Sequence, residues 1–277
     1  MYLPIRSLGT LILGAIPLVG PMPVHGKHLP LHESLEPADQ SLSRPFNSEL
    51  FNKSLSPLPN DRYPPTTPPP TGGGGRDICP SEDESPSPLM PLAPEVYAYG
   101  GLTLAEQPTL WLYLPFDVTP EMAIELSIEP SENDSLDSLT GTFTAPDLQQ
   151  GFVGIPLSST QFSLPLDESF LWTLRLYCGG IDETDGLDYL FAKAWITRVD
   201  ETDVSIPILE NVTDEALSAA YRDNSLWYDA LSVLGESLAT GDATPGSSAA
   251  WEGLLEDGGF ESLTEESPVQ LLVLPTE

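Results

Sequence analysis

Residues 104–116 read LAEQPTLWLYLPF, and the six residues between Pro108 and Pro115 are almost all apolar. A strand at the surface of a protein alternates apolar and polar residues, so that only one of its faces is apolar. In this stretch the leucines would form one face and enter a core, while Trp111 and Tyr113 would form the other. We expect the C-terminal part of the chain to cover that second face. The alternatives are an exposed aromatic surface for a sugar ring or a protein partner, and a self-association face.

The residues around this stretch predict a mainly β domain over residues 79–200. Short apolar or alternating runs bounded by Gly and Pro predict further strands at residues 123–129, 139–144, 151–157, 170–178 and 189–199. No helical pattern separates these runs. We therefore expect an antiparallel β-sandwich, immunoglobulin-like in architecture.

After Asp200 the spacing of apolar residues becomes helical. Thr213 and Asn224 are predicted to cap two helices. A third helix, led in by Ser247 and Ser248, is predicted to stop at Gly258 and Gly259. Their apolar faces carry tryptophans that three short helices cannot bury alone. We expect the helical segment, residues 201–260, to pack on the sandwich, with residues 261–277 as a C-terminal tail.

The first residues have the order of a secretory signal. Arg6 precedes an apolar run at residues 8–20, which is too short to span a bilayer and is followed by small residues. We expect residues 1–26 to be a signal peptide and the protein to be exported, periplasmic or extracellular. An uncleaved membrane anchor is the alternative; no second apolar stretch of spanning length follows. Residues 27–78 are rich in Pro, Ser and Gly and predict a disordered linker, or a Pro-rich ligand for a partner.

The only two cysteines are Cys79 and Cys178. In an oxidising compartment two thiols usually pair, and a disulfide across so long a loop contributes about 4 to 5 kcal/mol in the chain-entropy model. Two independent buried thiols are the alternative. The alternation along the strand at 170–178 places Cys178 on the core face.

The chain carries 42 acidic and 10 basic residues, for a formal net charge of −32. Nucleic acid and anionic lipid both require Lys or Arg to displace their counterions, so neither is expected as a partner. Such a charge also repels itself unless salt screens it. We therefore expect a protein adapted to saline surroundings.

All three histidines, His25, His28 and His32, precede the predicted sandwich. This excludes a Ser-His-Asp triad, a His-ligated zinc ion and a histidine base from the folded part. We expect no catalysis. The enzyme class that survives is a carbohydrate-active enzyme that works with two carboxylates alone.

Calcium is the one cofactor that the sequence leaves open, because it binds clustered oxygen ligands. The best cluster of candidate ligands comprises Asp182, Glu183, Asp185 and Asp188. It is a weak candidate because it lacks the spacing of an EF-hand. The alternative is a solvated loop. A poorer cluster comprises Glu132, Asp134 and Asp137.

Six short pieces together resemble one known family. They are ICP (78–80), QPTLWLYLP (107–115), LWTLRLYC (171–178), AWITRV (194–199), NSLWYDALSVL (224–234) and WEGLL (251–255). In this order, over about the last 200 residues, they resemble the cyanobacterial family known as domain of unknown function 928. The resemblance implies an exported protein of the cyanobacterial envelope or exterior, and it implies no established activity.

These observations favour an exported, non-catalytic binding or scaffolding module of the cell envelope. Its partner would be a protein or an envelope glycan. The alternatives are the carboxylate-dependent carbohydrate-active enzyme and a calcium-stabilised carbohydrate-binding module.

Overall fold

The computed structural model describes residues 89–97, 100–131, 135–180, 189–204, 212–263 and 268–275. The predicted signal peptide, the predicted linker and Cys79 lie outside these residues. The described part of the chain is mainly β, with three helices toward its C-terminal end.

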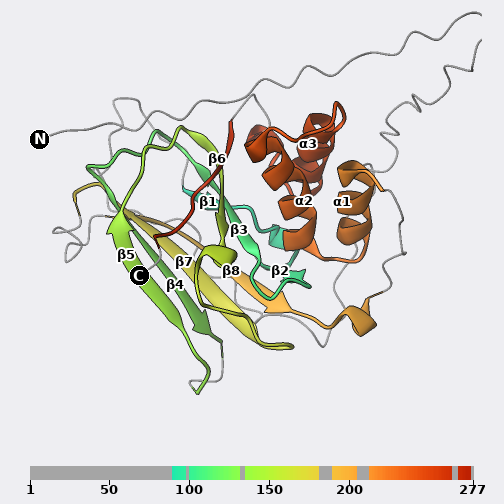
Figure 1. The fold of residues 1–277 in the computed structure, drawn as a ribbon, viewed down its shortest axis with the longest axis horizontal. Coiled ribbons are helices and arrows are strands. Elements are labelled where there is room, and N and C mark those ends of the chain that lie inside the picture. The colour runs from blue at the N-terminus through green and yellow to red at the C-terminus, as the bar shows by residue number, and fades with distance from the viewer. Residues whose placement is uncertain are drawn as a thin grey trace, which may run out of the picture. The chain divides into compact units, whose positions relative to one another are not determined.

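Two sheets form the sandwich (Figure 1). The four-stranded sheet has the order β1-β3-β6-β9. Its strands are β1 (Met90–Pro91), β3 (Thr109–Leu114), β6 (Gly151–Pro156) and β9 (Val269–Leu271). The five-stranded sheet has the order β2-β8-β7-β4-β5. Its strands are β2 (Gly100–Thr103), β8 (Tyr189–Arg198), β7 (Ser169–Tyr177), β4 (Ala123–Pro130) and β5 (Leu139–Thr144).

The expected sandwich is confirmed, but the sheets are mixed rather than purely antiparallel. β2 runs parallel to β8, and β9 runs parallel to β6. The sequence did not predict β1, β2 or β9. The predicted C-terminal tail is therefore partly ordered, because it contains β9 and the 3-10 helix η6 (Glu261–Leu263).

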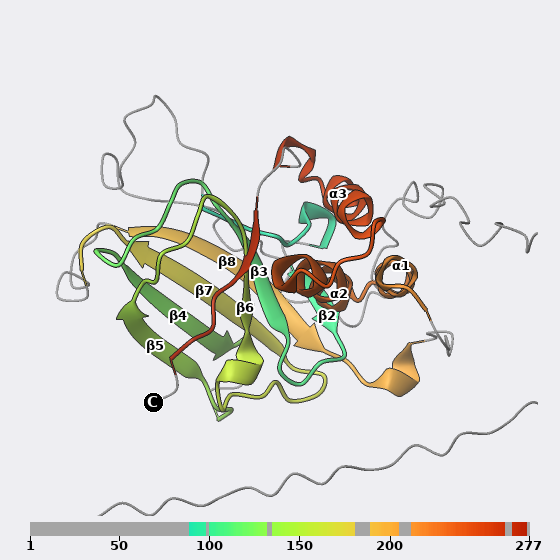
Figure 2. The ribbon, with the colours of Figure 1, turned by 45° about the horizontal axis from the view of Figure 1, so that its top comes forward.

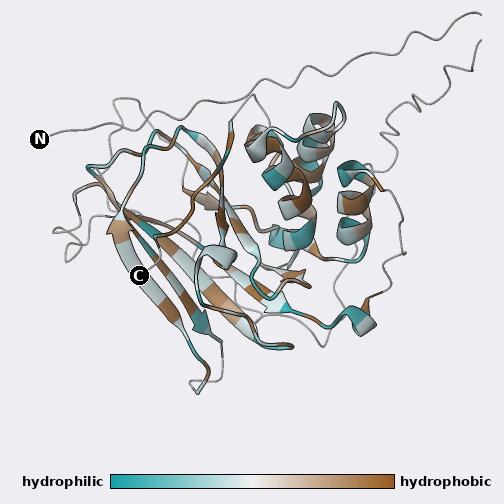
Figure 3. Cartoon of the chain, viewed as in Figure 1, coloured by the Kyte–Doolittle hydropathy of each residue, from teal (hydrophilic) through white to brown (hydrophobic). Residues whose placement is uncertain are grey.

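Each long strand directs one of its faces into the core between the two sheets. Apolar and polar residues alternate along β4 and β5, whose apolar side faces this core (Figure 3). From β3 the core receives Leu110, Leu112 and Leu114, and from β7 it receives Trp172, Leu174 and Leu176. Leu272 and Leu274, which follow β9, are buried in the same core.

Three helices form a third layer beside β2 and β3 (Figures 1 and 2). They are α1 (Asp214–Asp223), α2 (Trp227–Thr240) and α3 (Ser247–Asp257). α2 contacts β2, β3, β6 and β9, and α1 and α3 pack against α2. The remaining 3-10 helices are η2 (Glu95–Tyr97), η3 (Leu157–Ser159) and η5 (Glu201–Asp203).

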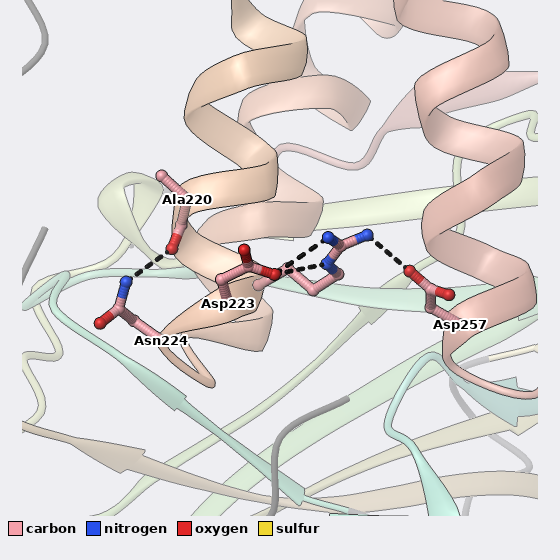
Figure 4. Close-up of polar contacts among 5 residues, drawn as sticks. Ala220, Asp223, Asn224 and Asp257 are labelled. Carbon is pink, nitrogen blue, oxygen red and sulfur yellow. Dashed lines mark hydrogen bonds and ion pairs between the residues drawn. The ribbon is translucent and has the colours of Figure 1, made fainter. Parts of the chain in front are cut away.

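One of the two predicted helix caps is confirmed. The Thr213 hydroxyl accepts a hydrogen bond from the Ala216 N–H at the start of α1. Asn224 does not cap α2, whose N-terminal flanking residue is Leu226. The Asn224 amide instead donates a hydrogen bond to the Ala220 carbonyl, 2.9 Å away, and closes the end of α1 (Figure 4).

A buried arginine joins α1 to α3. Arg222 is only 2% exposed, and its guanidinium donates to the carboxylates of Asp257 at 2.7 Å and Asp223 at 2.9 Å (Figure 4). A buried charge without such partners would be strongly unfavourable. The contact with Asp257 therefore ties the end of α1 to the end of α3, while Asp223, the next residue of α1, supplies the second carboxylate.

The helical layer covers the second face of β3, as expected. Trp111 is fully buried and Tyr113 is 6% exposed, and both belong to a second apolar core with residues of α2 and α3. The alternative reading of these two residues as an exposed aromatic surface is wrong. Their rings are large enough to need a cover, and the helices supply it.

Candidate functional site

The candidate metal ligands fall mostly outside the described residues. This holds for Asp182, Glu183, Asp185 and Asp188, and for Glu132 and Asp134 of the poorer cluster. Asp137 is described and exposed. Within the described ranges, no group of three or more His, Cys, Asp or Glu residues could hold a metal ion.

The most distinctive surface is the outer face of the five-stranded sheet, on the side away from the sandwich core. Where β7 and β8 meet, this face carries three aromatic rings and two cations, which we call the aromatic strip: Tyr177, Tyr189, Phe191, Arg175 and Lys193. The strand register places Tyr177 beside Tyr189 and Arg175 beside Phe191. None of the five side chains belongs to either apolar core.

The rings of the aromatic strip follow one another along the sheet. The ring centroids of Tyr177 and Tyr189 lie 5.3 Å apart, and those of Tyr189 and Phe191 lie 6.3 Å apart. Tyr177 is buried, whereas Tyr189 and Phe191 are half-buried. Tyr189 and Phe191 are therefore the partly exposed aromatic residues of the strip.

Each cation of the aromatic strip lies over a ring. The Arg175 guanidinium carbon is 5.7 Å from the Tyr189 centroid, and the Lys193 ammonium nitrogen is 5.1 Å from the Phe191 centroid. Both separations lie within the range of a cation–π attraction, which contributes about 0.5–1 kcal/mol at exposed sites. The long side chains thus shield part of the rings while their charged ends stay near water.

Glu125 of β4 completes the polar rim of the strip. Its carboxylate accepts a hydrogen bond from Arg175 and one from the Tyr177 hydroxyl at 3.3 Å. Burial lowers the pKa of Arg175, but the Glu125 carboxylate outweighs burial and raises it. Burial and the same carboxylate both raise the pKa of Tyr177. Arg175 therefore stays charged and Tyr177 stays protonated at neutral pH.

Two of the four basic side chains of the described residues lie on the aromatic strip. Arg222 is buried between two carboxylates. Arg198 donates to the Leu164 carbonyl and lies 3.9 Å from Glu106. Arg175 and Lys193 are the remaining two, and both lie on the strip.

One carboxyl group has a strongly shifted pKa. Burial raises the pKa of Asp229, in the first turn of α2, to about 6. Hydrogen bonds oppose this shift, including one from the Leu104 N–H at 3.1 Å. Such a pKa suits a general acid, but these donors already occupy the carboxylate. We therefore assign Asp229 a structural role, holding α2 against the segment between β2 and β3.

Cys178 follows β7 and is half-buried, so the expectation that its side chain enters the core is wrong. The alternation of β7 ends at Tyr177, one residue earlier. Its predicted disulfide partner, Cys79, lies outside the described residues, and the pairing stays a prediction.

The sequence of β8 contains a signal for the aromatic strip. The outward positions of β8 carry Tyr189, Phe191 and Lys193, where an ordinary solvent-facing strand would carry small polar residues. This signal predicts a surface only when β7 and β8 are known to be neighbours and their outward faces are known.

The fold and the strip define the class: a two-layer β-sandwich with a helical third layer and an aromatic, cationic patch on its free sheet face. The family model described as Domain of Unknown Function (DUF928) matches residues 71–268, more than half of the chain, so this protein belongs to the DUF928 family. A search of curated proteins found no match. In the part of the chain that the structure describes, no helix combines the length and the apolar character needed to cross a membrane.

Proposed function

We propose that this protein is an exported, non-catalytic binding module of the cell envelope, and that it holds a neutral glycan on the aromatic strip. The observation that carries the proposal is the row of rings formed by Tyr177, Tyr189 and Phe191, bordered by Arg175, Lys193 and Glu125. Sugar rings stack on aromatic faces, and charged or amide groups at the rim bind their hydroxyls.

The charge balance favours a neutral glycan over an acidic one. The chain carries a net charge of −32, and two accessible cations cannot offset that field at long range. Arg175 is moreover engaged by Glu125. An acidic polysaccharide would therefore be repelled before it reached the strip.

Binding rather than hydrolysis is supported by the spacing of carboxylates on this face. Glu125 and Glu129 are the described carboxylates on the outward positions of β4. At about 3.3 Å per residue their Cα atoms lie roughly 13 Å apart, whereas the two carboxyl groups of glycoside hydrolases are approximately 5 to 9.5 Å apart. The Glu125 carboxylate also already accepts hydrogen bonds from Arg175 and Tyr177.

Export to a cyanobacterial envelope is part of the proposal, and it rests on the first residues and the two cysteines. Residues 1–26 read as a signal peptide, and Cys79 and Cys178 would pair in an oxidising space. Mass analysis after alkylation of material from the native host tests this part. A retained leader together with two alkylated thiols would refute it.

The binding test uses soluble probes of two charges. We expect a neutral β-glucan oligosaccharide to bind the full chain, and a uronate oligosaccharide of equal length to bind much more weakly. Replacing Tyr189 and Phe191 by Ala should weaken neutral-glucan binding at least about tenfold, since stacking rings are typical hot spots. Glu129→Gln, at an exposed outward position of β4, is the matched control. Equal binding by the double variant and the parent chain would overturn the proposal, as would preference for a protein partner in a native envelope pull-down.

A further inference from the structure

The free edge of the five-stranded sheet is unusual for so acidic a protein. β5 ends this sheet, and among the described residues no strand pairs with its outer side (Figure 1). Its six residues read LTGTFT and contain no charge and no proline. Natural edge strands are normally guarded by charges, prolines or bulges, because an unguarded edge pairs with other strands.

The two faces of β5 carry different residues, and each face could meet the same face of a second copy of β5. Thr140, Thr142 and Thr144 are exposed on the outer face, while Leu139, Gly141 and Phe143 are half-buried toward the core side. At Gly141 a side chain would meet no atom within 4 Å, so the core side of β5 has an open space there.

We propose that β5 pairs with β5 of a second copy of this chain, antiparallel, about a two-fold axis at Thr142. In that register Thr142 faces its own copy, and Thr140 faces Thr144 of the other chain. Phe143 of each copy then faces Gly141 of the other, so its ring covers the open space above that glycine. Cross-strand aromatic contact of this kind stabilises glycines in sheets.

Charge decides the conditions under which the pair forms. The carboxylate nearest to the axis on the outer face is Glu125, the partner of Thr142 in β4, and Arg175 neutralises it. The two Glu125 side chains would lie three strand spacings apart, roughly 14 Å, which exceeds the Debye length of about 8 Å at physiological salt. The remaining negative charge of the two chains still opposes association, so salt should promote it.

The paired sheets would place both aromatic strips on one side of a continuous sheet. The two β7 strands would be separated by five strand spacings, roughly 24 Å. A polymeric ligand could then engage both strips, which raises avidity without any new contact. The dimer itself does not depend on the proposed function.

Sedimentation of the full chain over a range of concentrations, at low and high sodium chloride, tests for the dimer. We expect the weight-average mass to rise with concentration toward twice the chain mass, and to rise further at high salt. Thr142→Lys should weaken association at least about tenfold, because the two ammonium groups would face each other across the axis. Thr140→Lys is the matched control, since its lysine would face a threonine. A monomer at every salt concentration would overturn the proposal.

Cross-linking tests the register. Under mild oxidation Thr142→Cys should form a disulfide-linked dimer, because the two positions are directly opposite each other. Thr140→Cys should not, because its two copies would lie roughly 13 Å apart along the strands. The parent chain controls for its own cysteines. Equal cross-linking of the two variants, or none in Thr142→Cys, would refute this register.

Discussion

Gly235 of α2 lies so close to the Trp111 indole that a methyl group at Gly235 would be under 3.0 Å from three ring atoms. Gly154 of β6 leaves a similar space, since a Cβ there would lie 2.8 Å from Cη2 of the same ring. The indole N–H donates to the Ser232 hydroxyl at 3.3 Å. The ring also meets Trp251 edge-on, with centroids 5.5 Å apart. Two glycines on different elements therefore make room for the tryptophan that joins the helices to the sheet.

Gly235→Ala should destabilise the protein, although alanine is the better helix former. The gain in helix propensity is about 1 kcal/mol, while forcing a methyl group into a packed core costs about 1–3 kcal/mol. We expect a net loss of roughly 1 kcal/mol or more in the free energy of unfolding, measured by urea denaturation. Gly180→Ala is the control, because its Cβ would meet only the Glu121 carbonyl oxygen, at 3.8 Å. Higher stability of Gly235→Ala would show that the Trp111 ring can move aside.

The same contact shows what the sequence could predict and what it could not. The apolar pattern on both faces of residues 109–114 was enough to predict a core on one side and a helical cover on the other. It could not identify Gly235 as the residue that receives Trp111, because that contact joins elements 124 positions apart in the sequence.

Two of the strands that the sequence did not predict share a physical cause. β2 and β9 are short strands held by parallel neighbours distant in the sequence, so their own residues carry little strand signal. The aromatic strip was missed for a related reason. Tyr189 and Phe191 form a surface only because β8 lies beside β7 with those side chains facing outward.

Tyr228 of α2 connects the helical layer to the five-stranded sheet through its hydroxyl. This oxygen accepts a hydrogen bond from the Trp172 indole at 2.8 Å and donates one to the Trp195 carbonyl at 2.9 Å. Tyr228→Phe would leave the buried Trp172 indole N–H without its acceptor and would remove the hydrogen bond to the Trp195 carbonyl. We expect the free energy of unfolding to fall by about 1–3 kcal/mol.

The matched control for Tyr228→Phe is Tyr221→Phe. The half-buried Tyr221 hydroxyl makes no hydrogen bond within the described residues, so its loss should change the unfolding free energy by less than about 0.5 kcal/mol. Burial raises the pKa of Tyr228. The difference between the two variants should therefore stay constant from acid to neutral pH. Equal stability of the two would mean that water replaces the Tyr228 hydroxyl.

Asp229 should make the protein less stable as the pH rises from about 4 to about 6. Its pKa is raised from 3.8 to about 6, so in this window the folded chain binds a proton that the unfolded chain has released. The stabilisation that Asp229 contributes is fully present below its pKa in the unfolded chain. It is lost as the pH rises through its pKa in the folded chain. The shift of about 2 pH units corresponds to a change of about 3 kcal/mol at most.

The measurement is urea unfolding of the parent chain and Asp229→Asn across this window. The variant should lose the downward slope with pH, whereas Glu252→Gln, at an exposed position on α3, should keep it. Comparing variants is necessary because Glu215 acts in the opposite direction. Burial raises the pKa of Glu215, but hydrogen bonds from hydroxyls, including Thr244, outweigh it and lower the pKa. If the unfolding free energy of Asp229→Asn still fell with pH as steeply as that of the parent chain, the raised pKa of Asp229 would be contradicted.

Salt should raise the melting temperature of this protein. A net charge of −32 opposes the compact state, and the Debye length falls from about 10 Å at 0.1 M salt to about 3 Å at 1 M. We expect a continuous rise of the melting temperature with sodium chloride, at a protein concentration low enough to exclude association.

Calcium at equal ionic strength separates screening from a specific site at Asp182, Glu183, Asp185 and Asp188. A melting temperature that calcium raises above the sodium curve, and that returns to it in Asp185→Asn, would support that site. Coincident curves would assign the whole effect to screening, and a melting temperature independent of salt would contradict adaptation to saline surroundings.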